Sequence, residues 1–268
     1  MNAESFFSHY PFRKNDSDKF DNGVIAFLSG SYGMAGAAIL NLIGARCTGA
    51  SYIHSYLPAS IYPVVAANEI TTVYHPYNDT KEEIFDENSF RKVKAVALGS
   101  GINNLKYSEN YLKQILSFVS VPVIIDAQGL RILSQNESFY SLSSKMILTP
   151  HLGEFSGLTG LSKKDILKDR EGIAVSFAKE KGITLILKGP DTLIVSSEGK
   201  VTINNSGNAA LAQAGSGDVL CGMVCGFCAL YENTYQACVD AVWLHGHLAD
   251  LYVQDHANHT LDLRDYPL

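Results

Sequence analysis

The chain has 268 residues, of which 46% are hydrophobic, and a formal net charge of −6 at pH 7. This acidic balance leaves no basic footprint for nucleic acid. The longest apolar run, Val219–Leu230, is shorter than the roughly 20 residues that cross a bilayer, so we expect no membrane association. Without any linker-like segment, 1–268 is expected to be one α/β domain.

Short apolar runs alternate along the chain with helical patterns. The predicted strands are Val24–Leu28, Ser51–Leu57, Ile70–Tyr74, Val93–Leu98, Val121–Ile125, Met146–Leu148, Ile183–Leu187 and Thr192–Ser196. The predicted helices are Ala37–Arg46, Glu109–Val119, Lys164–Lys181 with Gly182 as its C-cap, Val219–Leu230 and Thr234–Val253. This order predicts a mainly parallel sheet with helices on both faces. Sites in such sheets lie at the carboxyl ends of the strands.

Two groups of potential metal ligands are better explained as parts of the core. Cys221, Cys225 and Cys228 recur at helical spacing, which is typical of small buried residues on one helix face. His245 and His247 are two positions apart on a predicted helix and therefore point to different sides. The N-terminus lacks the apolar segment of a signal peptide, and the cysteines suggest a reducing cytoplasm.

Glycines follow two of the predicted strands. The spacing in Gly30–Gly36 is G-x-x-G-x-x-G, which differs from the dinucleotide-binding fingerprint, and Gly99-Ser100-Gly101 follows Val93–Leu98. Each loop is either a plain turn or a place where the backbone approaches a ligand closely.

The segment Thr149–Phe155 combines restricted backbone with polar side chains. One interpretation is a helix start with Thr149 as its cap and Glu154 as a first-turn acid. The other is that His151 hydrogen-bonds a substrate. Lys188 ends a predicted strand and is either solvated or directed at a nucleotide phosphate.

Gly215-Ser216-Gly217-Asp218 is the most informative stretch, because it opens an apolar helix. Free N–H groups and the helix dipole favour an anion there, so Gly215, Ser216 and Gly217 form a candidate anion hole. A carboxylate beside a bound phosphate would only repel it, unless it removes a proton from a hydroxyl that attacks phosphorus. We therefore predict phosphoryl chemistry with Asp218 as the catalytic base.

In this order, these segments resemble the ADP-dependent NAD(P)H-hydrate dehydratase family, a branch of the ribokinase-like fold. The resemblance is carried by G-S-Y-G-M-A-G-A-A-I-L (Gly30–Leu40), T-P-H-L-G-E-F (Thr149–Phe155), K-G-P-D-T-L-I (Lys188–Ile194), N-S-G-N (Asn205–Asn208), A-G-S-G-D-V-L-C-G (Ala214–Gly222) and H-G-H-L-A-D (His245–Asp250).

The resemblance implies an enzyme that repairs hydrated NADH or NADPH. A nucleotide, ADP or ATP, phosphorylates the ring hydroxyl with Mg²⁺ present, and phosphate then leaves, so that ADP yields AMP and phosphate. The family pattern assigns the hydrated cofactor to Ala37, Gly101, His151 and Asp218. It assigns the adenine nucleotide to Lys188, Gly189, Pro190, Asp191, Thr192 and Gly217, and it connects Glu154 with the magnesium.

The chain departs from the family pattern in three places. The family's G-P-G-L-G is G-S-G-I-N here (Gly99–Asn103), its D-A-D-A-L is D-A-Q-G-L (Asp126–Leu130), and the tail after Asp250 is short. The epimerase domain that many relatives carry is expected to be a separate protein or missing, and the family tends to form homo-oligomers. A small-molecule kinase of the same fold and a non-catalytic nucleotide-binding homologue remain the alternatives.

Overall fold

Nine strands form one mixed sheet in the computed structural model, which describes residues 2–78, 81–82, 85–103 and 107–265. The strand order is β3-β2-β1-β4-β5-β6-β7-β8-β9. Neighbouring strands are parallel from β3 to β7 and antiparallel from β7 to β9. The strands are β1 Val24–Leu28, β2 Tyr52–Pro58, β3 Val73–Tyr77, β4 Ala95–Leu98, β5 Val123–Ile125, β6 Met146–Leu148, β7 Thr184–Leu187, β8 Thr192–Val195 and β9 Val201–Asn204.

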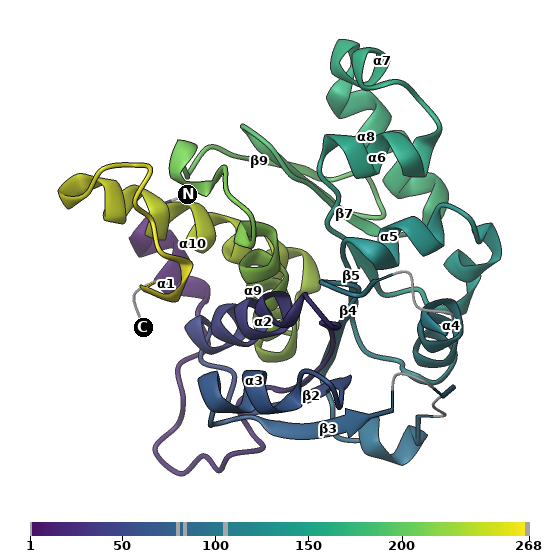
Figure 1. Cartoon of the computed structure of the whole chain (residues 1–268). Helices are drawn as coiled ribbons and strands as arrows, with labels where there is room; N and C mark the ends of the chain where they lie inside the picture. The colour runs from purple at the N-terminus through teal and green to yellow at the C-terminus, as the bar shows by residue number, and fades with distance from the viewer. Residues whose placement is uncertain (1, 79–80, 83–84, 104–106, 266–268) are drawn as a thin grey trace.

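Helices cover both faces of this sheet, as Figure 1 shows. They are α1 Ala3–His9, α2 Ala35–Cys47, α3 Tyr62–Asn68, α4 Ser108–Phe118, α5 Gln128–Leu133, α6 Leu152–Thr159, α7 Lys163–Lys168, α8 Arg170–Lys181, α9 Ser216–Leu230 and α10 Thr234–Asp255. In Figure 1, α2, α9 and α10 lie on one side of the sheet, and α4 and α5 on the other. None of the described helices combines the length and apolar character that a bilayer crossing requires.

The central strand β1 shows why both faces need cover. Ile25 and Phe27 join the hydrophobic cluster beneath α2, α9 and α10, whereas Val24, Ala26 and Leu28 join the cluster on the opposite face. All five side chains are buried. Strands that are apolar on both faces are typical of parallel sheets between two helical layers. The predicted α/β architecture is therefore confirmed.

Two glycines let α2 and α9 approach each other backbone to backbone. A β-carbon added to Gly44 would lie 2.1 Å from the Val219 carbonyl oxygen, and one added to Gly222 would lie 2.1 Å from the Asn41 carbonyl oxygen. Any side chain at either position would push the helices apart. This contact fixes the start of α9 relative to α2.

Most predicted elements are present, but the helices α1, α3 and α5 were not predicted, and three other elements differ from the prediction. The strand predicted at Ile70–Tyr74 begins later, as β3, and the edge strand β9 was not predicted. The helix predicted at Lys164–Lys181 is two helices, because Asp169 ends α7 and its carboxylate caps α8 by accepting from the Gly172 N–H. Gly182 does end α8 in the left-handed conformation, with φ of 65°.

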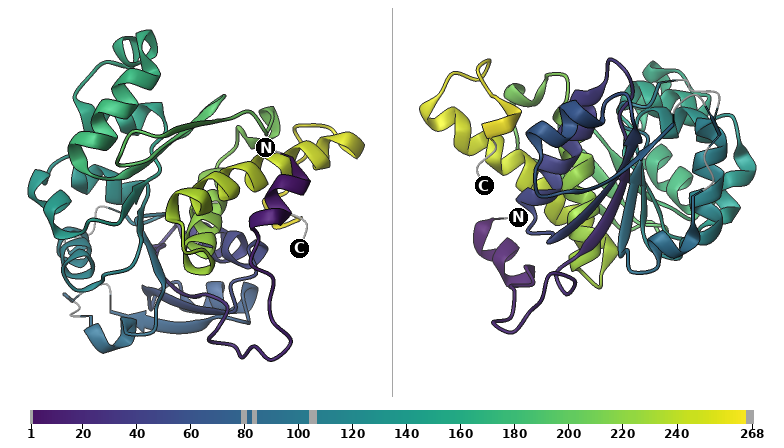
Figure 2. Two further views of the ribbon diagram at one scale, coloured as in Figure 1. Left: turned by 180° about the vertical axis from the view of Figure 1, so that it is seen from behind. Right: turned by 60° about the horizontal axis from the view of Figure 1, so that its bottom comes forward.

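The N-terminal helix α1 packs beside α10, as both views in Figure 2 show. Phe6 is buried there against Trp243 and Phe227, with ring centroids 5.1 Å and 5.9 Å away. This aromatic contact fastens the start of the chain to the layer that contains α9.

A histidine pair joins β2 to the edge strand β3. The two facing ring nitrogens, Nδ1 of His54 and Nε2 of His75, lie 2.8 Å apart, and the Tyr56 ring stacks on His75. Burial, followed by the charge that His75 can carry, lowers the pKa of His54 to about 4, and burial lowers that of His75. Both rings are therefore neutral at neutral pH, and one of the two facing nitrogens donates to the other.

Acidification should destabilise the fold through this pair. The unfolded His54 takes up a proton near its ordinary pKa of about 6.5, whereas the folded residue resists protonation until about 4, so stability falls as the pH drops through this window. We expect the Tm of His54→Phe to fall less than that of the wild type between pH 7 and pH 5. His259→Gln, at an exposed surface position, is the matched control. Parallel pH dependence in all three proteins would contradict this assignment.

Candidate active site

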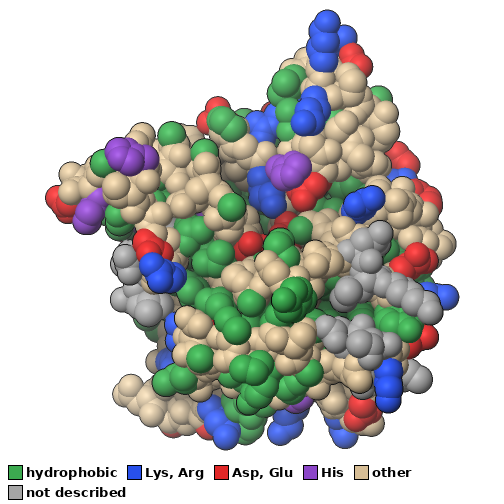
Figure 3. All heavy atoms as spheres, viewed as in Figure 1, with side chains coloured by type: hydrophobic (Ala, Val, Ile, Leu, Met, Phe, Trp, Pro, Cys, Tyr) green, Lys and Arg blue, Asp and Glu red, His purple; other side chains and the backbone are tan. Residues whose placement is uncertain are grey.

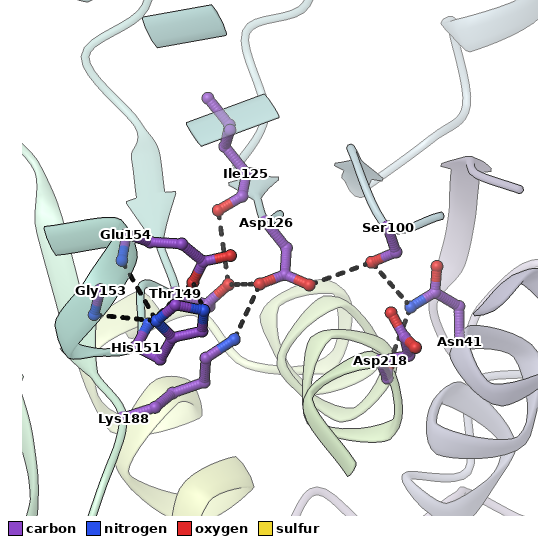
Figure 4. A network of polar contacts seen from close by, with 10 residues as sticks. All are labelled: Asn41, Ser100, Ile125, Asp126, Thr149, His151, Gly153, Glu154, Lys188 and Asp218. Atoms are coloured by element: carbon purple, nitrogen blue, oxygen red, sulfur yellow. Dashed lines mark hydrogen bonds and ion pairs between the residues drawn. The ribbon is translucent and has the colours of Figure 1, made fainter. Parts of the chain in front are cut away.

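Polar side chains from four neighbouring elements meet at the carboxyl ends of the parallel strands (Figure 4). Asp126 follows β5 and lies at the centre of the group. One of its carboxylate oxygens accepts from the Lys188 Nζ at 2.9 Å and from the Thr149 Oγ1 at 2.8 Å. The other accepts from the Ser100 Oγ at 3.2 Å. The Asn41 amide of α2 donates to this same Ser100 hydroxyl at 3.3 Å.

Burial makes the Asp126–Lys188 ion pair strong. The side chains of Lys188 and Asp126 are 18% and 3% exposed. Burial alone would lower the pKa of Lys188, but the carboxylates of Asp126 and Glu154 outweigh it and hold that pKa above its ordinary value. Lys188 is therefore a permanent cation at the base of the site.

Asp218 lies in the first turn of α9, on the opposite side of Asp126 from His151 in Figure 4. Its backbone carbonyl accepts from the Asn41 Nδ2 at 2.8 Å, which ties the turn to α2. Burial and the nearby Asp126 carboxylate raise the pKa of Asp218 to about 6, against the opposing effect of Lys188. A carboxylate with this pKa is ionised at neutral pH and basic enough to accept a proton.

The turn before Asp218 has the geometry of an anion site. Gly215 caps α9 with φ of 94°, a left-handed conformation that other residues rarely adopt. A β-carbon on Gly217 would lie 3.2 Å from the Lys188 Nζ, so the ammonium lies directly beside the helix start. The partial positive charge of the helix start and the charge of Lys188 thus act together at the first turn of α9.

Ser216 differs in part from its expected role in the anion hole. Its N–H approaches the Gln213 carbonyl oxygen at 3.5 Å and is therefore partly engaged. Its buried hydroxyl lies 3.4 Å from the His245 Nε2. Burial lowers the pKa of His245 to about 4, so this ring is neutral at neutral pH. The start of α9 is therefore braced from α10.

His151, rather than Thr149, caps helix α6. Its Nδ1 accepts from the Gly153 N–H at 2.9 Å and from the Glu154 N–H at 3.1 Å, and the Glu154 carboxylate accepts from the His151 N–H at 2.8 Å. The expectation of a Thr149 cap was wrong, because α6 begins at Leu152, which places Thr149 two residues before the N-cap position; its hydroxyl donates to Asp126. With Nδ1 accepting, Nε2 of the 61% exposed ring carries the proton and can donate to a ligand.

Ala37 and Gly101 lie against each other at the other end of the group. A β-carbon on Gly101 would lie 2.5 Å from that of Ala37. Their loops are tied together, because Gly30 N–H donates to the Ser100 carbonyl at 2.9 Å and the Ser31 hydroxyl donates to the Gly101 carbonyl at 2.7 Å. The glycine loops after β1 and β4 therefore form one wall of the site.

The predicted nucleotide-binding stretch Lys188–Thr192 forms the turn between β7 and β8. Gly189 and Asp191 have positive φ, and the Thr192 hydroxyl donates to the Gly189 carbonyl at 2.9 Å. Arg170 holds this turn from outside, donating to the carbonyls of Pro190 and Asp191 at 2.9 and 3.1 Å. Arg170 belongs to no motif of the sequence and lies inside the helix predicted at Lys164–Lys181, so sequence reasoning missed it.

Two motifs that lie far apart in the sequence, Asn205–Asn208 and His245–Asp250, are joined by hydrogen bonds. The Asp250 carboxylate accepts from the Gly207 N–H at 2.8 Å and from the Asn208 Nδ2 at 2.9 Å. Gly246 leaves room for Ser206, whose hydroxyl donates to the Trp243 carbonyl at 3.0 Å. The H-G-H-L-A-D helix therefore fastens the N-S-G-N loop that precedes α9.

The cysteines and the second histidine are structural. Cys221, Cys225 and Cys228 are buried in the cluster beneath α9, and all five cysteines are free. His247 stacks on Trp243 at 4.5 Å between ring centroids, away from His245. Among the described residues, no three or more His, Cys, Asp or Glu side chains are arranged to hold a metal ion.

Charged side chains of both signs gather where the site opens to solvent. On the face drawn in Figure 3, histidine, basic and acidic groups lie together where the projecting upper part of the molecule joins the rest. The exposed His151 ring lies 3.6 Å from Glu154, and the Lys188–Asp126 pair lies deeper. This opening is suited to a charged, phosphate-bearing ligand.

The mainly parallel sheet and the polar side chains gathered at its carboxyl edge define an α/β enzyme of the ribokinase-like fold. The sequence profile described as NAD(P)H-hydrate dehydratase matches residues 25–266, and the chain belongs to this family.

Similar proteins agree with this membership. The ADP-dependent (S)-NAD(P)H-hydrate dehydratase of Bacillus subtilis is 31% identical over 251 residues, which cover 94% of this chain and 88% of the relative. The crystal structure of the ADP/ATP-dependent enzyme from Bacillus subtilis, co-crystallised with ATP and Mg²⁺, matches with a TM-score of 0.85 and 28% identity, covering 98% and 92% of the two chains. A ribokinase-like protein from Enterococcus faecalis, 21% identical with a TM-score of 0.87, covers 99% and 91% and shows the same fold.

Lys188→Met should destabilise the protein strongly, because it leaves the buried Asp126 carboxylate without its cation. We expect a loss of about 3 kcal/mol in the free energy of unfolding, measured by urea denaturation at pH 7. Adding Asp126→Asn should recover most of this loss. Lys168→Met, which breaks an exposed pair with Asp165, is the matched control and should cost far less. If Lys188→Met and Lys168→Met lose the same free energy of unfolding, burial does not strengthen the Lys188–Asp126 pair.

Proposed function

We propose that this protein catalyses the ADP-dependent dehydration of the S form of hydrated NADH or NADPH, giving NAD(P)H, AMP and phosphate. The observation that carries the proposal is the placement of Asp218. Its carboxylate, whose pKa is raised to about 6, belongs to the first turn of α9. The same turn lies beside the Lys188 ammonium. The proposed base and the N–H groups proposed to bind phosphate therefore belong to the same helical turn.

In the first step, the ring hydroxyl of the hydrated cofactor attacks the β-phosphorus of ADP. Asp218 takes the hydroxyl proton as the new O–P bond forms, and the bond from phosphorus to AMP breaks. The N–H groups of Gly217 and its neighbours in the first turn, together with Lys188, stabilise the negative charge that spreads over the phosphoryl oxygens.

In the second step, the phosphate leaves. The C–O bond breaks with its electrons on phosphate. The departing phosphate or water takes a proton from the adjoining ring carbon, and the electrons of that C–H bond restore the double bond. Hydroxide is a poor leaving group and phosphate a good one, so the first step makes the second possible. His151 presents its Nε2–H at the exposed side of the site and is positioned to donate to the hydrated cofactor or to the departing phosphate.

The nucleotide is assigned to Lys188–Thr192 and Gly217. Arg170 keeps the β7–β8 turn in shape for it. The carboxylates available nearby are Asp126 and Glu154, both already hydrogen-bonded within the protein. If Mg²⁺ enters with the nucleotide, these two carboxylates are the groups that would hold it. When bound, the ion supplies charge neutralisation between the phosphates.

The proposal extends to the cellular setting. The enzyme acts in the cytoplasm as a homo-oligomer, with 1–268 forming one dehydratase domain. The free cysteines support a reducing compartment. Specificity for the S form calls for an epimerase that converts the R form, because hydration of the ring produces both.

Asp218→Asn should abolish turnover while ADP binding is kept, because the amide cannot take up the hydroxyl proton. We expect kcat to fall by about 10³-fold. The assay follows NADH regenerated from hydrated NADH and ADP, together with AMP; calorimetry follows ADP binding. Asp16→Asn, at an exposed position, is the control. A stable phosphorylated product in place of NADH would identify a small-molecule kinase, and no product despite bound ADP would identify a nucleotide-binding homologue.

The pH profile provides a second test of Asp218. Because the base must be ionised, kcat/KM for hydrated NADH should rise with pH and level off above about pH 6. Asp126→Asn removes a negative charge that raises the pKa of Asp218, so the inflection should move to lower pH. Asp165→Asn, on exposed α7, should leave it in place. If the inflection stays at the same pH in Asp126→Asn as in the wild type, the result would contradict the role of Asp218.

A further inference from the structure

A sharp turn in the loop after β1 presents Tyr32 to solvent at the edge of the site. The Met34 N–H donates to the Ser31 carbonyl at 2.7 Å, and Gly33 has φ of 83°, which is the geometry of a type II turn with Tyr32 in its second position. Tyr32 is 80% exposed, although Ser31 beside it is buried. The turn therefore exposes the flat ring of Tyr32, and the backbone that carries the ring is held in place.

The turn is fastened to the wall that holds Ala37 and Gly101. A β-carbon on Gly101 would lie 3.1 Å from the Met34 carbonyl oxygen, so the turn and the Gly101 backbone are in contact. The Ser31 hydroxyl donates to the Gly101 carbonyl at 2.7 Å. With the backbone of the turn held in place, only the side-chain freedom of Tyr32 is lost when its ring binds a ligand, which favours a stacking surface.

One departure from the family pattern has a partner in this turn. Asn103 stands where the family pattern has glycine, and its Nδ2 donates to the Tyr32 carbonyl at 3.3 Å. The substitution therefore adds a direct tie between the loop after β4 and the residue that carries the exposed ring. Gln128, another departure, begins α5.

We propose that Tyr32 stacks on the adenine of the hydrated dinucleotide, and that Asn103 holds the turn for it. The inference rests on the proposed function. The hydrated nicotinamide ring has to reach Asp218 in the interior, so the other end of the dinucleotide extends toward the rim, where Tyr32 lies. Hydration removes the planarity of the nicotinamide ring, which leaves adenine as the flat aromatic partner.

Truncating the substrate separates this contact from every other effect. For hydrated NADH, Tyr32→Ala should raise KM roughly 5- to 100-fold, as loss of one base–aromatic stack does, with kcat and KM for ADP unchanged. For the hydrated form of reduced nicotinamide mononucleotide, which lacks the adenosine half, the same variant should leave KM unchanged. Tyr32→Phe should behave as the wild type with both substrates, because the ring and not the hydroxyl makes the contact.

Asn103→Gly, which restores the family residue, should raise KM for hydrated NADH by a smaller factor. Phe12→Ala, which removes a 67% exposed ring on the N-terminal segment, is the control and should change neither KM. An active wild type with equal KM in Tyr32→Ala, or an equal KM increase for both substrates, would overturn the stacking role. A wild type that regenerates no NADH would instead overturn the proposed function.

Discussion

A buried carboxylate must be neutralised, and this requirement at Asp126 organises the site. Its oxygens accept from Lys188, Thr149 and Ser100, so the ends of β4, β5, β6 and β7 are joined through one group. The cost of desolvating the charge is offset only when the ammonium of Lys188 stays in place. That same ammonium lies beside Gly217 at the start of α9. The interaction that stabilises the sheet edge therefore also places the cation of the anion site.

The second constraint is the close contact of α2 and α9. Gly44 and Gly222 allow the two backbones to touch, and the Asn41 amide then bridges Ser100 and the Asp218 carbonyl. Asp218 is thus held in position relative to the strand ends by a backbone contact and a single amide. Its raised pKa follows from this placement, since burial and Asp126 both act on it there. Position and basicity of the proposed catalytic base have one structural origin.

Sequence patterns predicted what is local and missed what depends on pairing. Parallel strands such as Val24–Leu28 are apolar on both faces, and the left-handed Gly182 ends its helix, so both were readable from composition and order. The edge strand β9 is half-exposed and is defined by its partner β8 rather than by its own residues. The site shows the same division. Asp218 and Lys188 stand in motifs, whereas Arg170 acts through carbonyl groups of a turn that lies 17 to 21 residues away.

The reversal at Thr149 and His151 shows why a motif does not assign its own roles. Both residues precede α6 and either could cap it by residue type, and threonine is the commoner cap. The start of α6 at Leu152 decides the outcome, because it makes His151 the N-cap and leaves Thr149 two positions earlier, with its hydroxyl donating to Asp126. His151 caps the helix through Nδ1, which leaves the proton on Nε2 of the exposed ring. The helix start thus sets the tautomer of His151.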